Sequence, residues 1–210
     1  MPYRTESLEK YLADASAGRP TPGGGSASAL AGAVGVSMAC MAANFTVGKK
    51  KFESAWPRVR ELLAKCDESR DALLGDVDDD VASYSRVSAA YSMPKDTPEQ
   101  KAARADAVQA ALQVAMDTPM KVFLACADVL LLLGELARLA NPNLVSDVGV
   151  AAALVLGALD GAQLNVEINL AFLKDEEIAA ATRAKLEQAG PAAREAARKT
   201  LDKVYGAIRQ

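Results

Sequence analysis

Apolar residues recur every three or four positions over most of this chain, which is the spacing that places them on one face of a helix. No segment alternates polar and apolar residues as a half-buried strand does. The pattern predicts helices over residues 6–15, 58–92, 98–140, 146–173, 175–188 and 192–210. We therefore predict an all-α protein, an antiparallel bundle of long helices that forms a single domain over residues 1–210.

Capping residues and prolines mark the expected helix ends. Thr97 is predicted to cap the helix that follows it, with Pro98 in the first helical position and Gln100 completing a capping box. Pro119 should kink or split that helix. The pair Gly190-Pro191 should separate the two closing helices.

The helix near residue 146 also needs a cap at its start. Ser146 or Asp147 is expected to supply it, because both side chains accept hydrogen bonds from a first helical turn.

Residues 20–48 depart from the amphipathic pattern, because they carry no charge and are mostly small. The segment PTPGGG, residues 20–25, predicts a tight turn that leads into a slim helix. Ser26 and Ser28 are expected to cap the first turn of that helix. Three interpretations are open: a membrane-spanning helix, a buried central helix, or a buried helix whose glycine turn also holds a ligand.

Composition limits the chemistry of this 210-residue chain, which has a net charge of −3 and no histidine. The charge argues against a general nucleic-acid binder, and the lack of histidine excludes Ser–His, Cys–His and His–metal schemes. Cys40, Cys66 and Cys126 do not have the spacing of a metal site and suggest reduced thiols in a cytoplasm. The first residues lack the apolar core of a signal peptide.

Four acids lie inside the predicted helix 58–92, and helical geometry separates them. With Val77 at the centre of the apolar stripe, Asp79 lies about 160° away and Asp76 and Asp78 about 100° to either side. Asp80 lies only about 60° from the centre, so it is the acid drawn toward the core. We expect Asp78 and Asp79 to form a solvated face, and Asp80 to be either a satisfied buried acid or an acid–base group with a raised pKa.

Two further sets of polar residues need an explanation. Asn165 and Asn169 share one face of an otherwise apolar helix, so their amides should bond another helix or the glycine turn, or contact a polar heterocycle directly. The three lysines 49–51 form either a solvated helix end or a site for a ligand that carries carboxylates.

Five blocks resemble one family in both composition and order. They are TPGGGSASALAGAVG, NFTVGKKKF, VDDDVASY, MPKDTPEQ and SDVGVAAALVLGALDGAQLNVEINL. The chain resembles the cyclodeaminase family over nearly its whole length. This family comprises the C-terminal domain of formiminotransferase-cyclodeaminase and the stand-alone bacterial methenyltetrahydrofolate cyclohydrolases.

The resemblance implies an all-helical homodimer with a folate bound in a cleft near the subunit interface. It places a catalytic aspartate on Asp80, in a segment that reads Val-Asp-Ala-Asp-Ala-Glu in the bifunctional enzyme. Because Asp79 stands here in place of an alanine, Asp78, Asp79 and Asp80 all remain candidates. The expected substrate-binding residues are Gly23, Gly24, Gly25, Ser26, Asn44, Lys49, Lys50, Lys51, Asp147, Asn165 and Asn169.

Within this set, Asn165, Asn169 and the glycine turn are expected to hold the pterin, and the three lysines to meet the glutamate tail. Asp147 either caps its helix or faces the ligand. We expect no metal and no cofactor beyond the folate, and no nucleic-acid or membrane partner.

The family contains two activities. One closes the ring of 5-formiminotetrahydrofolate and expels ammonia; the other adds water to 5,10-methenyltetrahydrofolate to give 10-formyltetrahydrofolate. The chain shows no formiminotransferase domain, and lysines replace the arginines of the bifunctional form, so we expect the cyclohydrolase. A non-catalytic folate-binding module and a purely structural helical dimer are the alternatives.

Overall fold

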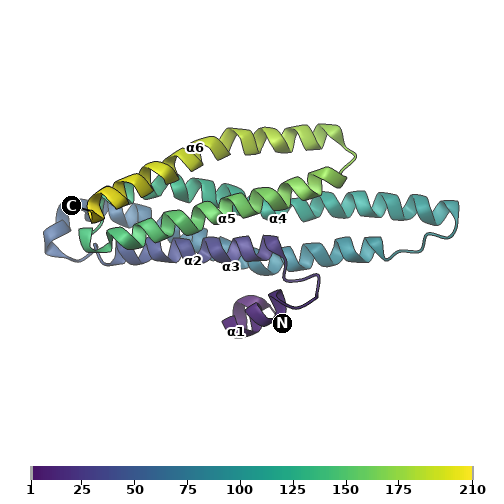
Figure 1. Cartoon of the computed structure of the whole chain (residues 1–210), viewed down its shortest axis with the longest axis horizontal. Coiled ribbons are helices and arrows are strands. Elements are labelled where there is room, and N and C mark those ends of the chain that lie inside the picture. The colour runs from purple at the N-terminus through teal and green to yellow at the C-terminus, as the bar shows by residue number, and fades with distance from the viewer. Residues whose placement is uncertain (1, 210) are drawn as a thin grey trace.

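The computed structural model describes residues 2–209, which form an all-α bundle (Figure 1). The α-helices are α1 (Leu8–Ala15), α2 (Gly24–Asn44), α3 (Trp56–Tyr91), α4 (Pro98–Leu139), α5 (Val145–Phe172) and α6 (Glu176–Ile208). Short 3-10 helices lie at Tyr3–Thr5, Lys50–Ala55 and Pro142–Leu144. The predicted fold class is confirmed.

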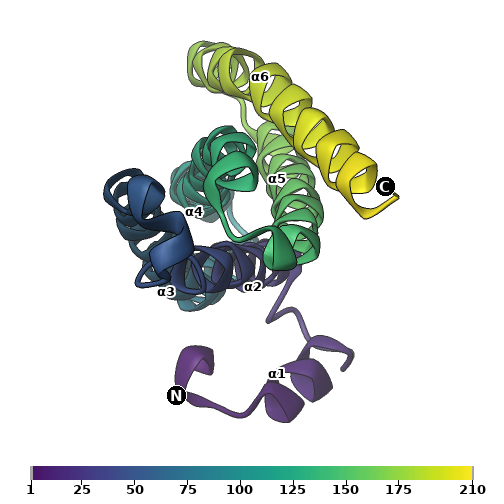
Figure 2. The same cartoon turned by 90° about the vertical axis from the view of Figure 1, so that its left-hand side faces the viewer.

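Helices α2 to α5 surround the main core, and α6 packs on the outside of α4 and α5 (Figures 1 and 2). The N-terminal helix α1 stands apart from the bundle, on the side of α2 (Figure 2). The long hairpin of α3 and α4 continues past the start of α2 (Figure 1). The hairpin has its own small core near that end, which contains Val87, Val108 and Leu112.

The slim helix α2 is central because its small residues let other helices approach its backbone closely. A methyl group added at Gly32 would lie 3.2 Å from Cys126 Sγ, and one at Gly35 would lie 2.8 Å from Val155 Cγ2. The bundle thus packs α5 and α4 against positions where a larger residue does not fit.

The predicted capping box at the start of α4 is confirmed. Thr97 Oγ1 accepts a hydrogen bond from the backbone N–H of Gln100 at 3.3 Å, and Gln100 Oε1 accepts one from Thr97 N–H at 3.2 Å. Pro98 occupies the first helical position.

Helix α6 runs without a break through Gly190-Pro191, so the predicted split into two helices is wrong. The lost N–H of Pro191 costs one helical hydrogen bond, but α6 is held along its length by packing on α4 and α5. Gly190 is buried close to Phe123 of α4, where an added methyl group would lie 3.3 Å from the ring. Tertiary packing therefore outweighs the local signal. Helix α4 is likewise one helix through Pro119, so it is not split there.

The expected caps on α2 and α5 are also wrong. The N-cap of α5 is Leu144, and no side chain caps it, so Ser146 and Asp147 lie inside the first turn. The N-cap of α2 is Gly23, and the hydroxyls of Ser26 and Ser28 donate instead to the carbonyl oxygens of Val77 and Gly24.

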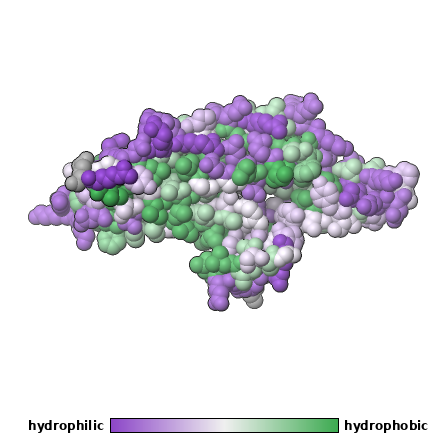
Figure 3. Space-filling model, in the orientation of Figure 1, coloured by the Kyte–Doolittle hydropathy of each residue, from purple (hydrophilic) through white to green (hydrophobic). Residues whose placement is uncertain are grey.

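Two segments, Gly24–Asn44 and Pro142–Phe172, are long and apolar enough to cross a membrane by length and composition. In α2, 61% of the apolar stretch is buried inside the bundle, so core packing accounts for its composition. Only 39% is buried in the second segment, which contains α5. Apolar side chains gather along the middle of the molecule in the region of these two helices (Figure 3).

We predict that Gly35→Ala lowers the free energy of unfolding by about 1–3 kcal/mol, because the new methyl group has no room against α5. The matched control is Gly75→Ala in α3, where an added methyl group meets nothing within 4 Å. That variant should be more stable than the wild type by about 0.5–1 kcal/mol, since alanine favours a helix more than glycine does. Urea unfolding of both variants checks the prediction, and equal effects at the two sites would contradict it.

Candidate functional site

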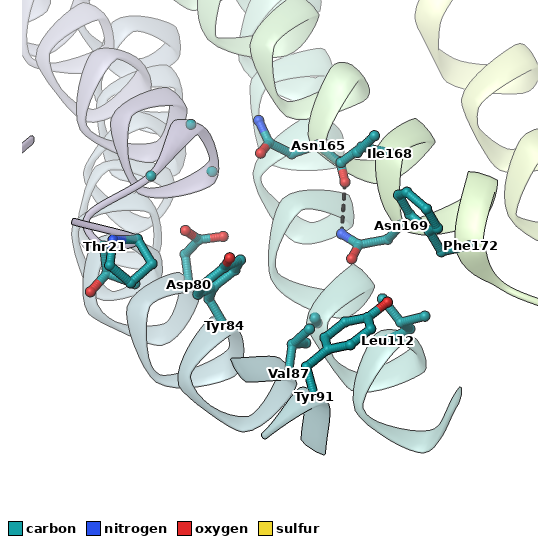
Figure 4. Close-up of a pocket in the computed structure, with 15 residues that line it drawn as sticks. Thr21, Asp80, Tyr84, Val87, Tyr91, Leu112, Asn165, Ile168, Asn169 and Phe172 are labelled. Atoms are coloured by element: carbon teal, nitrogen blue, oxygen red, sulfur yellow. Dashed lines mark hydrogen bonds between the residues drawn. The ribbon is translucent and has the colours of Figure 1, made fainter. Parts of the chain in front are cut away.

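A pocket of about 520 Å³ lies where the start of α2 meets α3, α4 and the C-terminal end of α5 (Figure 4). The glycine turn forms one wall, and Asn165 and Asn169 of α5 form another. Asp80 enters from α3 between these walls (Figure 4). The structure therefore brings together six of the residues predicted from sequence, namely Gly23, Gly24, Gly25, Asp80, Asn165 and Asn169.

Asp80 is fixed by the start of α2. Its Oδ2 accepts a hydrogen bond of 2.9 Å from the backbone N–H of Ser26, in the first turn of that helix. No side chain of α2 itself caps this end, so a carboxylate from α3 takes that part. The positive end of the helix dipole favours the ionised carboxylate.

Burial raises the pKa of the Asp80 carboxyl above its ordinary value, and the Ser26 N–H opposes that shift. The half-buried group remains open to the pocket that it lines. Among the hydrogen bonds of residues 2–209, those to Asp80 reach only Oδ2, so Oδ1 is available to a ligand or a water molecule. Such a carboxylate can stabilise a cation or accept a proton.

Gly25 must be a glycine because there is no room for a side chain at this position. A methyl group built there would lie 2.0 Å from Asp80 Oδ1 and 2.6 Å from Asp80 Cγ. Any side chain at Gly25 would therefore displace the carboxylate. A methyl group at Gly24 would crowd Asn165, whose Nδ2 lies 3.0 Å from that position. The glycine turn thus makes room for both polar groups.

The two amides on α5 bond their own helix, which neither expected alternative described. Asn165 Nδ2 donates to Gly161 O at 2.8 Å. Asn169 Nδ2 donates to Asn165 O, also at 2.8 Å (Figure 4). These bonds occupy one donor hydrogen of each amide and hold it in place. Each amide keeps an oxygen and a second hydrogen for a pocket ligand.

The remaining lining is largely aromatic and apolar, and sequence reasoning did not assign it to the site. Tyr84 and Tyr91 of α3 and Phe172 of α5 are each partly exposed at the pocket (Figure 4). The helical spacing contained the signal, since Tyr84 follows Asp80 by one turn and Phe172 follows Asn169 by three residues. Other lining residues are Pro20, Thr21, Val87, Leu112, Ala115 and Ile168.

The other three acids of α3 have different surroundings. Asp79 is exposed, as predicted. Asp78 is not simply solvated, because its carboxylate accepts a hydrogen bond from the backbone N–H of Tyr3 and lies 3.7 Å from Arg4 Nε.

Asp76 is buried, with 6% of its surface exposed, whereas Asp80 is only half-buried, so the prediction that Asp80 is the one acid drawn toward the core is wrong. Both α2 and α4 cover α3, and together they bury more of it than a single apolar stripe. Burial raises its pKa to about 6, and the charges of Asp79 and Asp80 add to this effect while Lys121 opposes it. It does not line the pocket.

Five predicted site residues lie away from the pocket, near the other end of α2. Asn44, Lys49, Lys50 and Lys51 follow the C-terminal end of α2, and Asp147 lies in the first turn of α5. The two ends are joined there, because Thr46 Oγ1 accepts a hydrogen bond of 2.8 Å from Asn141 N–H. The whole length of α2, about 30 Å, separates this cluster from the glycine turn within one protomer.

The residues present do not suggest a metal centre. Over residues 2–209 there is no group of three or more His, Cys, Asp or Glu side chains that could hold an ion. Cys40, Cys66 and Cys126 are free and buried.

The protein is an all-α helical bundle with a ligand-sized pocket, in which a carboxylate and two amides surround a glycine turn. Sequence comparison identifies its family. A family model described as formiminotransferase-cyclodeaminase matches residues 7–188. The chain belongs to this family.

Two relatives and one solved structure show how far the similarity extends. The chain is 38% identical over 174 residues to a methenyltetrahydrofolate cyclohydrolase from Methylorubrum extorquens, covering 83% of this chain and 84% of that one. It is 31% identical over 180 residues to formimidoyltransferase-cyclodeaminase from Rattus norvegicus, covering 86% of this chain and 33% of that one. The crystal structure of formiminotetrahydrofolate cyclodeaminase from Thermotoga maritima matches with a TM-score of 0.86 and 28% identity, covering 96% of this chain and 97% of that one.

We predict that Asp76 makes the stability of the fold depend on pH. Its pKa is about 6 in the folded protein and about 3.9 in an unfolded chain. Between these values the folded state binds more protons, so the free energy of unfolding falls as pH rises through this window and levels off above it. Asp76→Asn removes the charge and should therefore be more stable than the wild type by about 1–3 kcal/mol near pH 8.

The difference between wild type and Asp76→Asn should disappear near pH 4, as urea unfolding at several pH values can show. Asp79→Asn is the control, because it removes the same charge from an exposed position of the same acidic run. Parallel pH profiles for Asp76→Asn and the wild type would contradict the assignment.

Proposed function

We propose that this protein is a folate enzyme of one-carbon metabolism that hydrolyses 5,10-methenyltetrahydrofolate to 10-formyltetrahydrofolate. The observation that carries the proposal is the chemistry of the pocket. Its lining contains one carboxylate, Asp80, and no lysine or arginine. A negatively charged group in a largely apolar pocket favours a cationic ligand, and methenyltetrahydrofolate carries a delocalised positive charge at its one-carbon bridge.

The shape and polarity of the pocket also suit a pterin. Tyr84 and Phe172 offer aromatic faces, and Asn165 and Asn169 offer amides whose orientation is already fixed. The backbone N–H groups of Gly24 and Gly25, in the first turn of α2, lack partners within the helix and can donate to a carbonyl oxygen. No metal or further cofactor is needed for this chemistry.

In the proposed reaction, Asp80 stabilises the cationic bridge and orients a water molecule through Oδ1. The water oxygen bonds to the bridge carbon and gives up one proton to the carboxylate. The bond from this carbon to N5 then breaks as the new hydroxyl group loses its remaining proton to solvent and becomes the C=O of a formyl group on N10. N5 takes up the proton that the carboxylate had accepted, so one proton is released overall. The Ser26 N–H holds Oδ2 throughout, so the carboxylate does not have to reorganise.

The identity to the Methylorubrum cyclohydrolase, together with the lysines at 49–51, supports hydrolysis over deamination. Formiminotetrahydrofolate cyclodeaminase is the second candidate, favoured by the TM-score of 0.86 to the Thermotoga enzyme. Both reactions attack or expel a group at the same one-carbon unit, so one carboxylate can serve either.

We further propose that the active form is a homodimer that pairs through the exposed apolar face of α2 and α5. This face is formed by Val34 of α2 and by Val150, Leu164 and Ile168 of α5, all of them exposed. Ile168 also lines the pocket, so a second subunit on this face would stand at the pocket's edge. Exposed apolar side chains that are grouped on one face are typical of an interaction site.

The dimer also offers a role for the predicted residues near the other end of α2. If the two α2 helices run antiparallel across a twofold axis, the C-terminal end of one lies near the glycine turn of the other. We propose that Lys49, Lys50 and Lys51 reach the glutamate tail of a folate bound in the partner's pocket, with Asn44 and Asp147 beside them. Lysine side chains are flexible cations that suit such a tail.

We predict that Asp80→Asn lowers the turnover of methenyltetrahydrofolate at least about a hundredfold. The variant should keep its fold, because an amide oxygen can still accept the Ser26 N–H. The loss of methenyltetrahydrofolate absorbance measures hydrolysis, and a parallel ammonia assay with formiminotetrahydrofolate measures deamination. Asp79→Asn, at the exposed neighbouring position, should keep its activity.

Three outcomes would contradict this assignment. Full turnover by Asp80→Asn would remove Asp80 from the mechanism. Folate binding by the wild type with hydrolysis only at the buffer rate would indicate a binding module, and no folate binding at all would indicate a structural protein.

We predict that Leu164→Asp turns the dimer into a monomer. Burying a leucine contributes about 1.5–3 kcal/mol, and the substitution also places a charge in an apolar interface. Light scattering coupled to size-exclusion chromatography measures the change. Leu131→Asp on α4 is the control, because Leu131 is also exposed but lies outside this face, and it should remain dimeric. A monomeric wild type would refute the interface.

A further inference from the structure

The N-terminal lobe, residues 3–16, lies outside the bundle but is bonded to it on both sides of Asp80. The carboxylate of Asp78, two residues before Asp80, accepts a hydrogen bond from the backbone N–H of Tyr3 and lies near Arg4. On the other side, the hydroxyl of Tyr11 lies 3.1 Å from Ser26 Oγ. The sequence analysis predicted a helix over residues 6–15 but assigned none of its residues to the site.

The hydroxyl of Ser26 takes part in two hydrogen bonds, in one as donor and in the other as acceptor. Ser26 Oγ lies 2.9 Å from Val77 O, and a carbonyl oxygen can only accept, so the serine hydroxyl donates to Val77. The hydroxyl has no second hydrogen, and the tyrosine must therefore donate to Ser26 Oγ. Ser26 also gives its backbone N–H to Asp80 Oδ2 at 2.9 Å. A continuous chain of bonds runs from Tyr11 through Ser26 to Asp80.

Tyr11 is built into this arrangement rather than resting on its surface. It is 5% exposed, and its ring packs edge-on against Tyr3 with 5.3 Å between the ring centroids. Ser26 is fully buried. A buried hydroxyl that both accepts and donates has little freedom to move, and the backbone of the same residue is fixed with it.

We infer that Tyr11 is a positioning residue for the reaction, which sets the place of the Asp80 carboxylate by holding Ser26. The expected effect on kinetics rests on the proposed function. The chain of hydrogen bonds from Tyr11 to Asp80 is independent of that function. A shift of the Ser26 N–H by a fraction of an ångström would lengthen its bond to Asp80 Oδ2 and let the carboxylate turn away from the bound folate.

Few groups face Asp80, so a change at Tyr11 should be detectable as a change in the pKa of Asp80. On its own helix they are Asp76 and Tyr84, from α1 the Tyr11 hydroxyl, and from α2 the Ser26 N–H. The pocket residues of α4 and α5 carry no charge. Because the Ser26 N–H lowers the pKa of Asp80, weakening that bond raises this pKa.

The test replaces Tyr11 by phenylalanine, which keeps the buried ring and removes only the hydroxyl. The matched control is Tyr3→Phe, which removes a hydroxyl from the same lobe whose 2.9 Å bond goes to Asp14 and not to the bundle. We expect Tyr11→Phe to lower kcat about fivefold and to leave KM within about twofold. The acidic limb of its pH–rate profile should move to higher pH, because Asp80 must be ionised, and Tyr3→Phe should move neither.

A second measurement separates this inference from the proposed function. Carboxyl-carbon NMR follows the titration of Asp80 directly and needs no turnover, with Asp80→Asn used to assign the signal. We expect the Asp80 titration to move to higher pH in Tyr11→Phe and to stay in place in Tyr3→Phe. In a Ser26→Ala background, Tyr11→Phe should have no further effect on it, because the bond chain is already cut.

The outcomes are distinct. A wild type without turnover refutes the proposed function, while a shifted Asp80 titration in Tyr11→Phe would still support the bond chain. An unchanged Asp80 titration in Tyr11→Phe overturns the inference, even if the variant melts at a lower temperature, because Tyr11 would then only stabilise the fold.

Discussion

The hydrogen bond from the Ser26 N–H to Asp80 joins the start of α2 to the middle of α3, and the pocket is arranged around it. A helix start leaves N–H groups without partners, and a carboxylate is the natural group to meet them. Here the carboxylate comes from a different helix, so the same hydrogen bond caps α2 and holds the acid in the pocket. The arrangement works only because Gly25 has no side chain, since a methyl group there would overlap Asp80.

The same constraint explains the composition of α2. A helix that must approach α3, α4 and α5 closely cannot carry large side chains on those sides, and glycines such as Gly32 and Gly35 stand where neighbours come nearest. Glycine in a helix costs stability, and the burial of leucine and valine side chains from the surrounding helices offsets that cost. The smallness of α2 thus serves the packing along its length and the pocket at its start.

Much of this could be predicted from sequence because the relevant signals are local. Periodicity identified the helices other than α2, which its small residues and glycine turn indicated. The angle from Val77 placed Asp80 on the inward side of α3, where it lines the pocket, but Asp76 is the more buried of the two acids. Asp76 shows the limit of that reasoning. Its angle of about 100° placed it away from the single apolar centre, but α3 is covered by α2 on one side and by α4 on another, so its buried sector is wider than one stripe indicates. The unbroken course of α6 through Gly190-Pro191 could not be predicted for a related reason, since α6 packs on α4 and α5 there, with Phe123 beside Gly190, and these contacts join residues far apart in the sequence.

The residues that sequence reasoning grouped into one site lie at the two ends of α2 within a protomer, and this separation has a physical consequence. A single chain offers an acid, amides and aromatic faces at one end and a cluster of cations at the other, with α2 between them. Placing the cations away from Asp80 keeps the carboxylate from being neutralised by an ion pair, so its charge stays available to a cationic ligand. A second copy that packs antiparallel on the apolar face of α2 and α5 would restore a complete site without bringing lysine and aspartate into contact within one chain. The uncharged surface of α2, the exposed leucine and isoleucine of α5 and the distance between the two polar clusters then have one common explanation.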